Sequence, residues 1–329
     1  MSDMAGSTPK SRLGLSDTWL SPIGLGTWQF SQGQGLVGRF WPSLAPAVIL
    51  SIVEEALNHG INWFDTAAVY GGGRSEEMLA TALDNLGLAP DAVAIATKWW
   101  PVLRSAANLE GSIAERQEHL HQRPITLYQI HQPYSMSSIP RQMEAMARLL
   151  DAGLIRHAGV SNFSAAQMVQ AHRTLKAHGH LLASNQVRYH LLDRRIETNG
   201  LMSAAQDLGI SIIAYSPLGQ GLLTGRFHDG AGKRPEGLRR YDPHFRPRAL
   251  KKVEPLITAL KDMAERYRAT PAQVALNWIV TRPGVSVFAI PGATRVSQAA
   301  QSAGAMRFTL SSSDRQALDH VSGQVLGSP

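Results

Sequence analysis

The sequence predicts one (β/α)8 barrel of the α/β class, preceded by a small β-hairpin. Short apolar, β-prone runs alternate eight times with amphipathic helical segments, and no shift in composition divides the 329 residues into two domains. The first strand is not followed by the glycine fingerprint of a dinucleotide-binding doubly wound sheet. These observations favour a barrel over the Rossmann alternative.

The elements are predicted in order from hydrophobic periodicity and from turn residues. Residues 12 to 22 alternate around Ser16 and Asp17 and predict the hairpin. Strands are expected over residues 23–28, 61–65, 92–98, 126–131, 156–161, 183–187, 211–215 and 286–290. Helices are expected over residues 47–59, 75–86, 105–121, 138–152, 164–177, 200–208, 250–267 and 271–281, with long loops over 29–46 and 216–249. Residues 1–11 are expected to be a disordered tail, residues 12–310 the barrel, and residues 311–329 a C-terminal helix and tail.

Composition excludes several classes of protein. Hydrophobic residues make up 44% of the chain, which is ample for a large core, and the absence of cysteine excludes disulfides, thiolate nucleophiles and cysteine-ligated metals. The amino terminus lacks the apolar core of a signal peptide, and the apolar window from Leu44 to Leu57 is too short to span a bilayer. We therefore expect a soluble, cytoplasmic protein with no membrane partner.

The chain is basic, with a formal net charge of +7, and much of the excess lies in residues 226–252. A solvated basic loop, a loop that holds a polyanionic cofactor, and a nucleic-acid surface would each account for it. No stacking aromatic residues or known reading motif accompany the charge, so we expect no nucleic-acid partner.

Polar residues end most of the predicted strands. They are Asp65, Lys98, His131, Ser161 with Asn162, Gln186 and Tyr215. Any one of them alone would most often be a satisfied core or rim residue. Because the carboxyl ends of barrel strands meet at one mouth, their joint occurrence predicts a functional site.

Acid–base chemistry is the first function that this set suggests. Tyr70 follows Asp65 by five residues and precedes the break at Gly71 to Gly73. A free tyrosine is too weak an acid to protonate a carbonyl well at pH 7, and a cation beside it lowers its pKa. Lys98 would be that cation, oriented by Asp65, while His131 donates a hydrogen bond to the same oxygen.

The residues at the remaining strand ends and in the loops after them suit a ligand in which a flat, amide-bearing ring is joined to phosphate groups. Asn162 and Gln186 match a carboxamide, and Tyr215 can stack on an aromatic ring. Small residues over 216–225 allow a backbone to approach a pyrophosphate, with Arg226 as counter-charge. The turn over residues 290–295 opens a helix, and a helix amino terminus favours phosphate.

The chain resembles the aldo-keto reductase superfamily, in its bacterial type. The matching motifs, in the family's order between Leu13 and Gly304, are GINWFDTAAVYGGGRSEEML, ATKWW, LYQIHQP, GLIRHAGVSNF, ASNQVRYHLLDR, AYSPLGQGLLTGRF, TPAQVALNW and IPGAT. The resemblance implies a (β/α)8 barrel that binds NADPH in extended form and reduces aldehydes or ketones by hydride transfer. The implied catalytic tetrad is Asp65, Tyr70, Lys98 and His131, with Tyr70 as the proton donor to a small-molecule carbonyl substrate.

The resemblance also implies the binding residues. Those expected to hold the cofactor are Gly26, Thr27, Trp28, Asp65, Ser161, Asn162, Gln186, Tyr215, Ser216, Pro217, Leu218, Gln220, Gly221, Arg226, Ile290, Gly292, Thr294, Arg295, Gln298, Gln301 and Ser302. Those expected to form the substrate pocket are Trp28, Trp41, Tyr70, Trp99 and His131. Relatives often carry Glu-Asn in place of Gln301 and Ser302, and Arg in place of Thr294. The contacts to adenine and the preference for NADPH over NADH are therefore the least determined part of the site.

Two alternatives follow from other features. Potassium-channel β-subunits share the same motifs, so an NADP-binding regulatory subunit of a membrane protein, with low turnover, is the second function considered. The spacing of His119 and His121, with one residue between them, would be compatible with a zinc site. Side chains two residues apart on a helix do not face the same way, however, so no metal site is expected. Substrate identity, reaction direction and self-association into a homo-oligomer are not readable from the residues.

Overall fold

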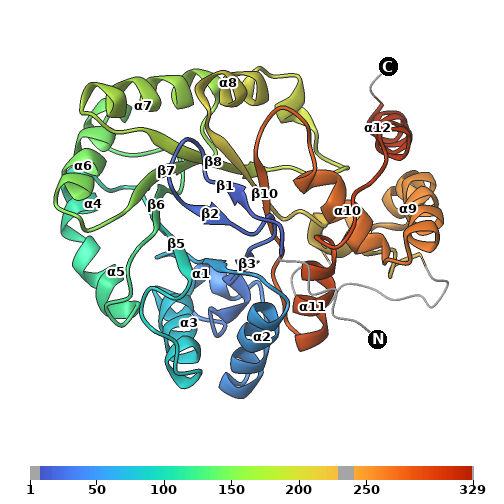
Figure 1. The fold of residues 1–329 in the computed structure, drawn as a ribbon, viewed down its shortest axis with the longest axis horizontal. Helices are drawn as coiled ribbons and strands as arrows, with labels where there is room; N and C mark the ends of the chain where they lie inside the picture. The colour runs from blue at the N-terminus through green and yellow to red at the C-terminus, as the bar shows by residue number, and fades with distance from the viewer. Residues whose placement is uncertain (1–7, 229–240, 328–329) are drawn as a thin grey trace.

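The computed structural model describes residues 8–228 and 241–327, and in these residues the fold is an eight-stranded parallel barrel ringed by helices (Figure 1). The strands are β3 (Leu25–Gly26), β4 (Trp63–Asp65), β5 (Ala94–Trp99), β6 (Leu127–Ile130), β7 (His157–Ser161), β8 (Leu182–Arg188), β9 (Ser211–Tyr215) and β10 (Val287–Ile290). They pair in sequence order from β3 to β10. Parallel bridges from Ile23 to Ala289 and from Gly26 to Gly292 bring the last strand back to the first. The predicted barrel is confirmed.

The helices follow the predicted order. They are η1 (Trp28–Phe30), α1 (Gly35–Gly38), α2 (Pro46–Asn58), α3 (Arg74–Asn85), α4 (Ala106–Gly111), α5 (Ile113–His119), α6 (Ile139–Asp151), α7 (Ala165–Ala177), η2 (Arg195–Glu197), α8 (Leu201–Leu208), η3 (Gly219–Thr224), η5 (Pro243–Phe245), α9 (Pro247–Tyr267), α10 (Pro271–Val280), α11 (Val296–Gly304) and α12 (Ser312–Leu326). Capping boxes start two of them: Ser164 with Gln167 begins α7, and Thr270 with Gln273 begins α10.

One predicted helix and the end of the predicted tail differ from the structure. The single helix expected over residues 105–121 is wrong, because the chain breaks between Gly111 and Ser112 into α4 and α5. A Gly-Ser pair is a weak point in a helix, and the Ser112 hydroxyl bonds back to the Leu109 carbonyl there. The expected tail over residues 1–11 and basic loop over 226–252 lie partly outside the described residues, while Ser11 already belongs to a strand.

The amino-terminal hairpin closes the end of the barrel opposite the strands' carboxyl ends. Strands β1 (Ser11–Arg12) and β2 (Trp19–Leu20) pair antiparallel and lie across the barrel in Figure 1. The hairpin is tied to the start of β9 by the bond from Gly14 N–H to Ser211, and to the segment before β4 by the bond from Ser21 N–H to Asn62. One end of the barrel is thereby plugged, and the other is left for a site.

The core has two parts, separated by the sheet. Inward-facing strand residues, among them Trp63, Ile213 and Phe288, fill the barrel beneath the hairpin, together with Leu13 of the hairpin itself. Outward-facing strand residues pack against the surrounding helices in the larger cluster. Because strand side chains alternate, β4 directs both Trp63 and Asp65 inward, one to the plugged end and one to the open mouth.

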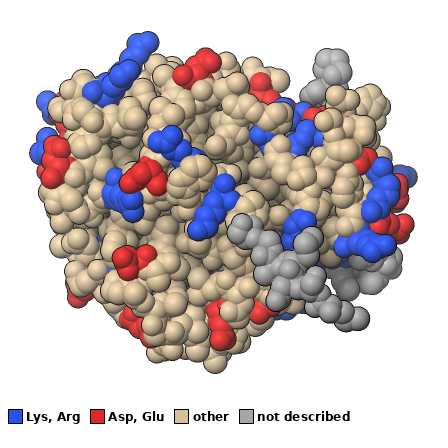
Figure 2. All heavy atoms as spheres, viewed as in Figure 1, with Lys and Arg blue, Asp and Glu red and all other residues tan. Residues whose placement is uncertain are grey.

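The described surface carries charges of both signs. On the face shown in Figure 2, basic and acidic side chains lie interspersed, with no broad patch of one sign. None of the described helices is long and apolar enough to cross a membrane.

Packing at the barrel floor generates a stability prediction. A Cβ at Gly24 would lie 2.3 Å from the Trp63 ring, whereas a Cβ at Gly323, within α12, meets nothing within 4 Å. Gly24→Ala should therefore lower the free energy of unfolding by about 1–3 kcal/mol through overpacking. Gly323→Ala, the matched control, should raise it by up to about 1 kcal/mol. Chemical denaturation measures both, and a Gly24→Ala protein as stable as the wild type would contradict this packing.

Candidate active site

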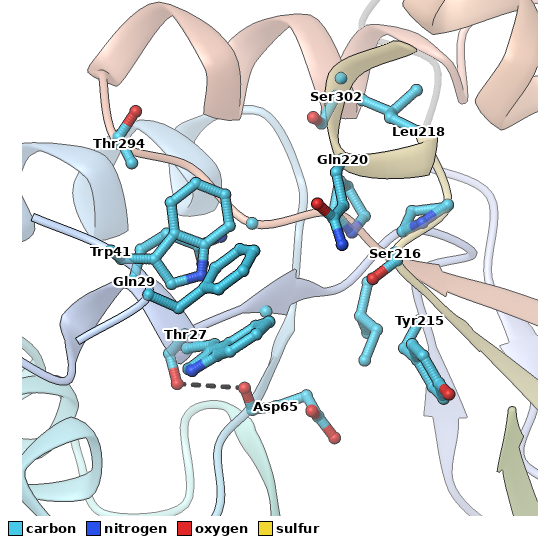
Figure 3. Close-up of a pocket in the computed structure, with 18 of the residues that line it drawn as sticks. Thr27, Gln29, Trp41, Asp65, Tyr215, Ser216, Leu218, Gln220, Thr294 and Ser302 are labelled. Carbon is cyan, nitrogen blue, oxygen red and sulfur yellow. Dashed lines mark hydrogen bonds between the residues drawn. The ribbon is translucent and has the colours of Figure 1, made fainter. Parts of the chain in front are cut away.

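A cavity of about 690 Å³ opens at the carboxyl ends of the strands. Figure 3 shows it as an elongated groove with Asp65 at its base, Gln29, Trp41 and Thr294 along one side, and Tyr215, Ser216 and Gln220 along the other. Every residue that the sequence analysis assigned to cofactor binding lines this cavity. Of the four residues expected to form a tetrad, Asp65, Tyr70 and His131 line it, and Lys98 lies buried directly behind.

A buried ion pair lies at the base of the cavity. The Nζ of Lys98 is 2.5 Å from Oδ1 of Asp65 and 2.9 Å from the Thr66 carbonyl, and the two charged residues are 0% and 1% exposed. Burial lowers the pKa of Lys98, while the charges of Asp65 and Glu76 and the bond to Asp65 raise it again. The ammonium is thus fixed in position by two oxygen acceptors.

Two buried glutamines hold the other oxygen of Asp65. The Nε2 of Gln186 donates to Oδ2 at 2.8 Å, and the Nε2 of Gln129 donates to the same atom at 3.3 Å. Gln129 was not singled out from the sequence. The sequence could have indicated Gln129, because it lies two residues before His131 and therefore faces the same side of the strand. With its amide used by Asp65, Gln186 presents an Oε1 that accepts no hydrogen bond from a described residue.

Tyr70 lies against this ion pair, but its acidity differs from the expectation. The Lys98 ammonium is 5.1 Å from the centroid of the Tyr70 ring. Burial raises the pKa of Tyr70 well above its usual value, and the charges of Asp65 and Tyr215 add to the effect. The expected lowering of the Tyr70 pKa is therefore wrong for this structure, because burial disfavours the phenolate and the charge of Lys98 is balanced by Asp65. The Tyr70 hydroxyl stays protonated through neutral pH.

His131 is uncharged at neutral pH. Its ring meets the edge of Tyr70 at a centroid distance of 5.8 Å. Burial lowers the pKa of His131 well below its ordinary range, and the nearby Lys98 charge lowers it further. No described residue hydrogen-bonds to its buried Nδ1. A neutral imidazole carries one N–H, so His131 can donate a single hydrogen bond into the cavity.

Asn162, Ser161 and Tyr215 form a hydrogen-bonded group beside His131. Asn162 donates from Nδ2 to the His131 carbonyl at 3.2 Å and to Ser161 Oγ at 3.1 Å, and its Oδ1 accepts from the Tyr215 hydroxyl at 3.0 Å. Asn162 has a backbone φ of 61°, a left-handed conformation that asparagine tolerates better than most residues. The group fixes the Tyr215 ring at the mouth of the barrel.

Aromatic rings form the wall next to Tyr70. Trp28 stacks on Tyr70 at a centroid distance of 6.0 Å and on Phe40 at 5.1 Å, and Trp41 packs edge-on against Trp28 at 5.9 Å. The assignment of Trp99 to this wall is wrong. Trp99 is the outward-facing residue after Lys98, is 1% exposed, and donates its indole N–H to Asn108 of α4. Its neighbour Trp100 lines the cavity instead, with its ring 5.3 Å from that of His131.

Gln29 is a second residue that the sequence did not reveal. It lies in η1, lines the cavity, is 8% exposed, and its Oε1 has no hydrogen-bond partner among the described residues. Its carboxamide lies over Gly292, where an added Cβ would be 2.1 Å from Oε1. A buried amide without a partner costs about 1–3 kcal/mol. The groove therefore offers an unused polar group halfway along its length.

The loop after β9 and the turn before α11 form the far end of the groove. Gln220 has a φ of 57°, and the Arg226 guanidinium lies 4.5 Å from the centroid of the Phe227 ring. In the turn, the Oε1 of Gln298 accepts from Thr294 N–H at 2.7 Å and from Arg295 N–H at 3.2 Å. Buried His190 packs near Gly219 under this loop, and burial lowers the pKa of His190 to about 4.

The two histidines considered for zinc face different carboxylates. His119 lies 3.5 Å from Glu76, which raises the pKa of His119, and His121 hydrogen-bonds to Asp84 at 2.6 Å. Among the described residues, no group of three or more His, Asp or Glu side chains is arranged to hold a metal ion.

Comparisons with known proteins agree with this geometry. The model of the aldo/keto reductase family matches residues 22–322. An uncharacterised oxidoreductase of Mycobacterium tuberculosis is 39% identical over 300 residues, which cover 91% of this chain and 88% of that protein. The chloroplastic pyridoxal reductase of Arabidopsis thaliana is 31% identical over 326 residues, covering 95% and 86%. The solved structure of a glycerol dehydrogenase from Gluconobacter oxydans has a TM-score of 0.83 at 26% identity, covering 98% of each chain.

The buried ion pair generates a prediction for a double-mutant cycle. Lys98→Met leaves the Asp65 charge buried without its partner, and should cost about 3–5 kcal/mol of unfolding free energy. Asp65→Asn combined with Lys98→Met removes both charges and should cost clearly less than the sum of the single changes. Urea denaturation of the four proteins gives the coupling energy.

The control for this cycle is the exposed pair between Arg148 and Glu110, which are 56% and 33% exposed. Its coupling energy should stay below about 1 kcal/mol. Equal coupling in the two cycles would show that burial does not strengthen the inner pair.

Proposed function

The chain belongs to the aldo/keto reductase family, and from that membership we propose that it reduces aldehydes or ketones to alcohols with NADPH, using Tyr70 as the general acid. The observation that carries the proposal is the meeting of Tyr70, His131 and the Asp65–Lys98 ion pair at one cavity. An NADP-binding regulatory role is the alternative that the experiment below separates from it.

The chemistry of this chain's own residues supports a carbonyl reductase. When bound, the nicotinamide would supply the hydride that adds to the carbonyl carbon. Tyr70 is protonated at neutral pH. It donates its proton to the carbonyl oxygen, which becomes a strongly basic alkoxide as the hydride adds and can therefore take a proton even from a weak acid. The tyrosinate that remains lies beside the Lys98 ammonium, and neutral His131 donates a hydrogen bond that orients the substrate oxygen. Such general acid catalysis contributes about 10²–10⁴ in rate.

The groove fits a dinucleotide. We propose that Ser161, Asn162 and the free Oε1 of Gln186 meet the carboxamide of the nicotinamide, whose ring stacks on Tyr215. The middle of an extended cofactor would pass the carboxamide of Gln29, whose Oε1 has no described partner, and Gly292, which has no side chain to obstruct it. The guanidinium groups of Arg226 and Arg295 line the same groove and favour its phosphates.

The wall beside Tyr70 supports a neutral substrate with an aromatic or apolar body. Trp28, Phe40, Trp41 and Trp100 present rings there, and Gln132 adds one uncharged polar group at the rim. Relatives are named for pyridoxal and for glycerol, so substrate choice varies among proteins of this fold. We propose aromatic aldehydes ahead of aldoses.

Loss of the Tyr70 hydroxyl is the direct test of function. Tyr70→Phe should reduce NADPH-dependent turnover of 4-nitrobenzaldehyde, methylglyoxal or pyridoxal by about 10²–10⁴ while NADPH affinity stays within about threefold. Tyr134→Phe, at a tyrosine that is 71% exposed, should retain wild-type turnover. Absorbance at the NADPH band gives the rates, and fluorescence quenching gives the affinity. A Tyr70→Phe enzyme as fast as the wild type would overturn the assignment, and NADPH binding without turnover in the wild type would favour the regulatory alternative.

The raised pKa of Tyr70 predicts how the two reaction directions depend on pH. Because the phenol stays protonated below its pKa, kcat/KM for reduction should be flat from pH 6 to beyond pH 8. Oxidation of the alcohol needs the phenolate, whose fraction rises tenfold per pH unit below the pKa, so its rate should rise steadily with pH. A reduction profile that falls with a midpoint near pH 7 would show instead that the Tyr70 pKa is lowered.

A further inference from the structure

Tyr70 is followed by a turn that has little rigidity of its own. Gly71, Gly72 and Gly73 have φ angles of 69°, 65° and 94°, all in the left-handed region. Glycine enters this region without steric cost, but it is also the residue with the most backbone freedom. The three glycines therefore allow the sharp turn without fixing where the Tyr70 hydroxyl lies, and contacts beyond the turn must fix it.

A cluster of three buried hydroxyl groups lies beside this turn. It consists of Ser75 in the first turn of α3, Thr27 directly before η1 and Thr66 directly after β4, and all three residues are fully buried. The Thr66 hydroxyl donates to Ser75 Oγ at 3.0 Å, and Ser75 Oγ donates to the Thr27 carbonyl at 2.7 Å. The Thr27 hydroxyl donates to the Asp65 carbonyl at 3.0 Å, as drawn in Figure 3. Each of the three hydroxyl protons thus has an acceptor.

Ser75 joins three parts of the candidate active site. Its backbone N–H donates to the Tyr70 carbonyl at 3.1 Å. Thr27, whose carbonyl accepts from the Ser75 hydroxyl, directly precedes the tryptophan that stacks on Tyr70. Thr66, whose hydroxyl donates to Ser75, supplies the carbonyl that accepts from Lys98 Nζ at 2.9 Å. One residue therefore connects the proton donor, the ring stacked on it and an acceptor of the ammonium beside it.

We propose that Ser75 is a positioning residue for the reduction, which holds the Tyr70 hydroxyl in place beside the Asp65–Lys98 ion pair. The inference rests on the proposed function, because it concerns how the proton donor of that reaction is held. Ser75 is not among the residues that line the cavity, so it acts through Tyr70 and Thr66 rather than on the substrate.

The expected effect follows from what loss of the Ser75 hydroxyl leaves behind. Without Oγ, the buried Thr66 hydroxyl loses its acceptor, and a buried polar group without a partner is unfavourable. The flexible glycine turn can then shift to relieve this, and Tyr70 shifts with it. A displacement of about 1 Å in a catalytic group can lower the rate about 10²-fold.

Ser75→Ala tests the proposal in a single turnover, in which the protein–NADPH complex is mixed rapidly with 4-nitrobenzaldehyde. The rate of NADPH oxidation should fall about tenfold to a hundredfold, while the Kd of NADPH stays within about threefold of the wild-type value. Ser322→Ala is the matched control. Ser322 is an equally buried helical serine, whose hydroxyl donates to the Leu191 carbonyl at 2.6 Å and which does not line the cavity. It should lower the midpoint of urea denaturation but leave the single-turnover rate unchanged.

Changes at Thr66 test the same hydrogen bond from its other side, and they decide the question if Ser75→Ala does not fold. Thr66→Val replaces the hydroxyl with a methyl group and should also slow the single turnover at least about tenfold. Thr66→Ser keeps the hydroxyl and should stay within about threefold of the wild-type rate. Because Ser75→Ala and Thr66→Val remove one shared bond, the double variant should be at most about threefold slower than the slower single variant.

A wild-type single-turnover rate in folded Ser75→Ala or in Thr66→Val would overturn the inference. Equal slowing in Ser322→Ala would do so too, because stability rather than the position of Tyr70 would then govern the rate. Multiplied effects in the double variant would show that the two hydroxyls do not act through one bond. Failure of the proposed function looks different: the wild-type protein itself would bind NADPH without any turnover of the aldehyde, and both proposals would then be refuted.

Discussion

The ion pair between Asp65 and Lys98 is the constraint on which the mouth of the barrel depends. Two charges that are 0% and 1% exposed lose their hydration, and this loss is offset only where further hydrogen bonds satisfy them. The structure supplies the Thr66 carbonyl for Lys98, and Gln129 and Gln186 for Asp65. Strands β4, β5, β6 and β8 are therefore tied together at one level, and Tyr70 and His131 stand directly above that level.

Above this level, the two sides of the cavity carry different kinds of side chain. The side beside Tyr70 is walled by aromatic rings, and the described residues place no charged side chain in that wall, which suits a neutral carbonyl compound. The opposite arm carries amides, small residues and arginines, which suits a long polyanion. The raised pKa of Tyr70 follows from the same arrangement, because burial disfavours the phenolate and the ion pair behind it has little net charge to offset this.

Much of this arrangement could be predicted from the sequence, for physical reasons. The alternation of strands and helices fixes the barrel, and parallel strands bring their carboxyl ends together, so Asp65, His131 and Gln186 meet wherever the exact boundaries fall. The direction of individual side chains was harder to predict from the sequence. Trp99 and Trp100 are adjacent, and only the register of their strand decides that Trp99 faces the helices while Trp100 lines the cavity. The break at Ser112, the unpartnered Gln29 and the raised Tyr70 pKa depend on contacts between distant segments, which local patterns do not encode.

The proposed function depends on direct hydride transfer to a carbonyl held at Tyr70. A single turnover with NADPH carrying deuterium at both positions of nicotinamide C4, an equimolar amount of protein and an aromatic aldehyde tests it most directly, with the alcohol analysed by mass spectrometry. Direct transfer predicts one deuterium on the carbinol carbon of the product. An alcohol formed without deuterium would contradict direct transfer, and so would deuterium recovered in water.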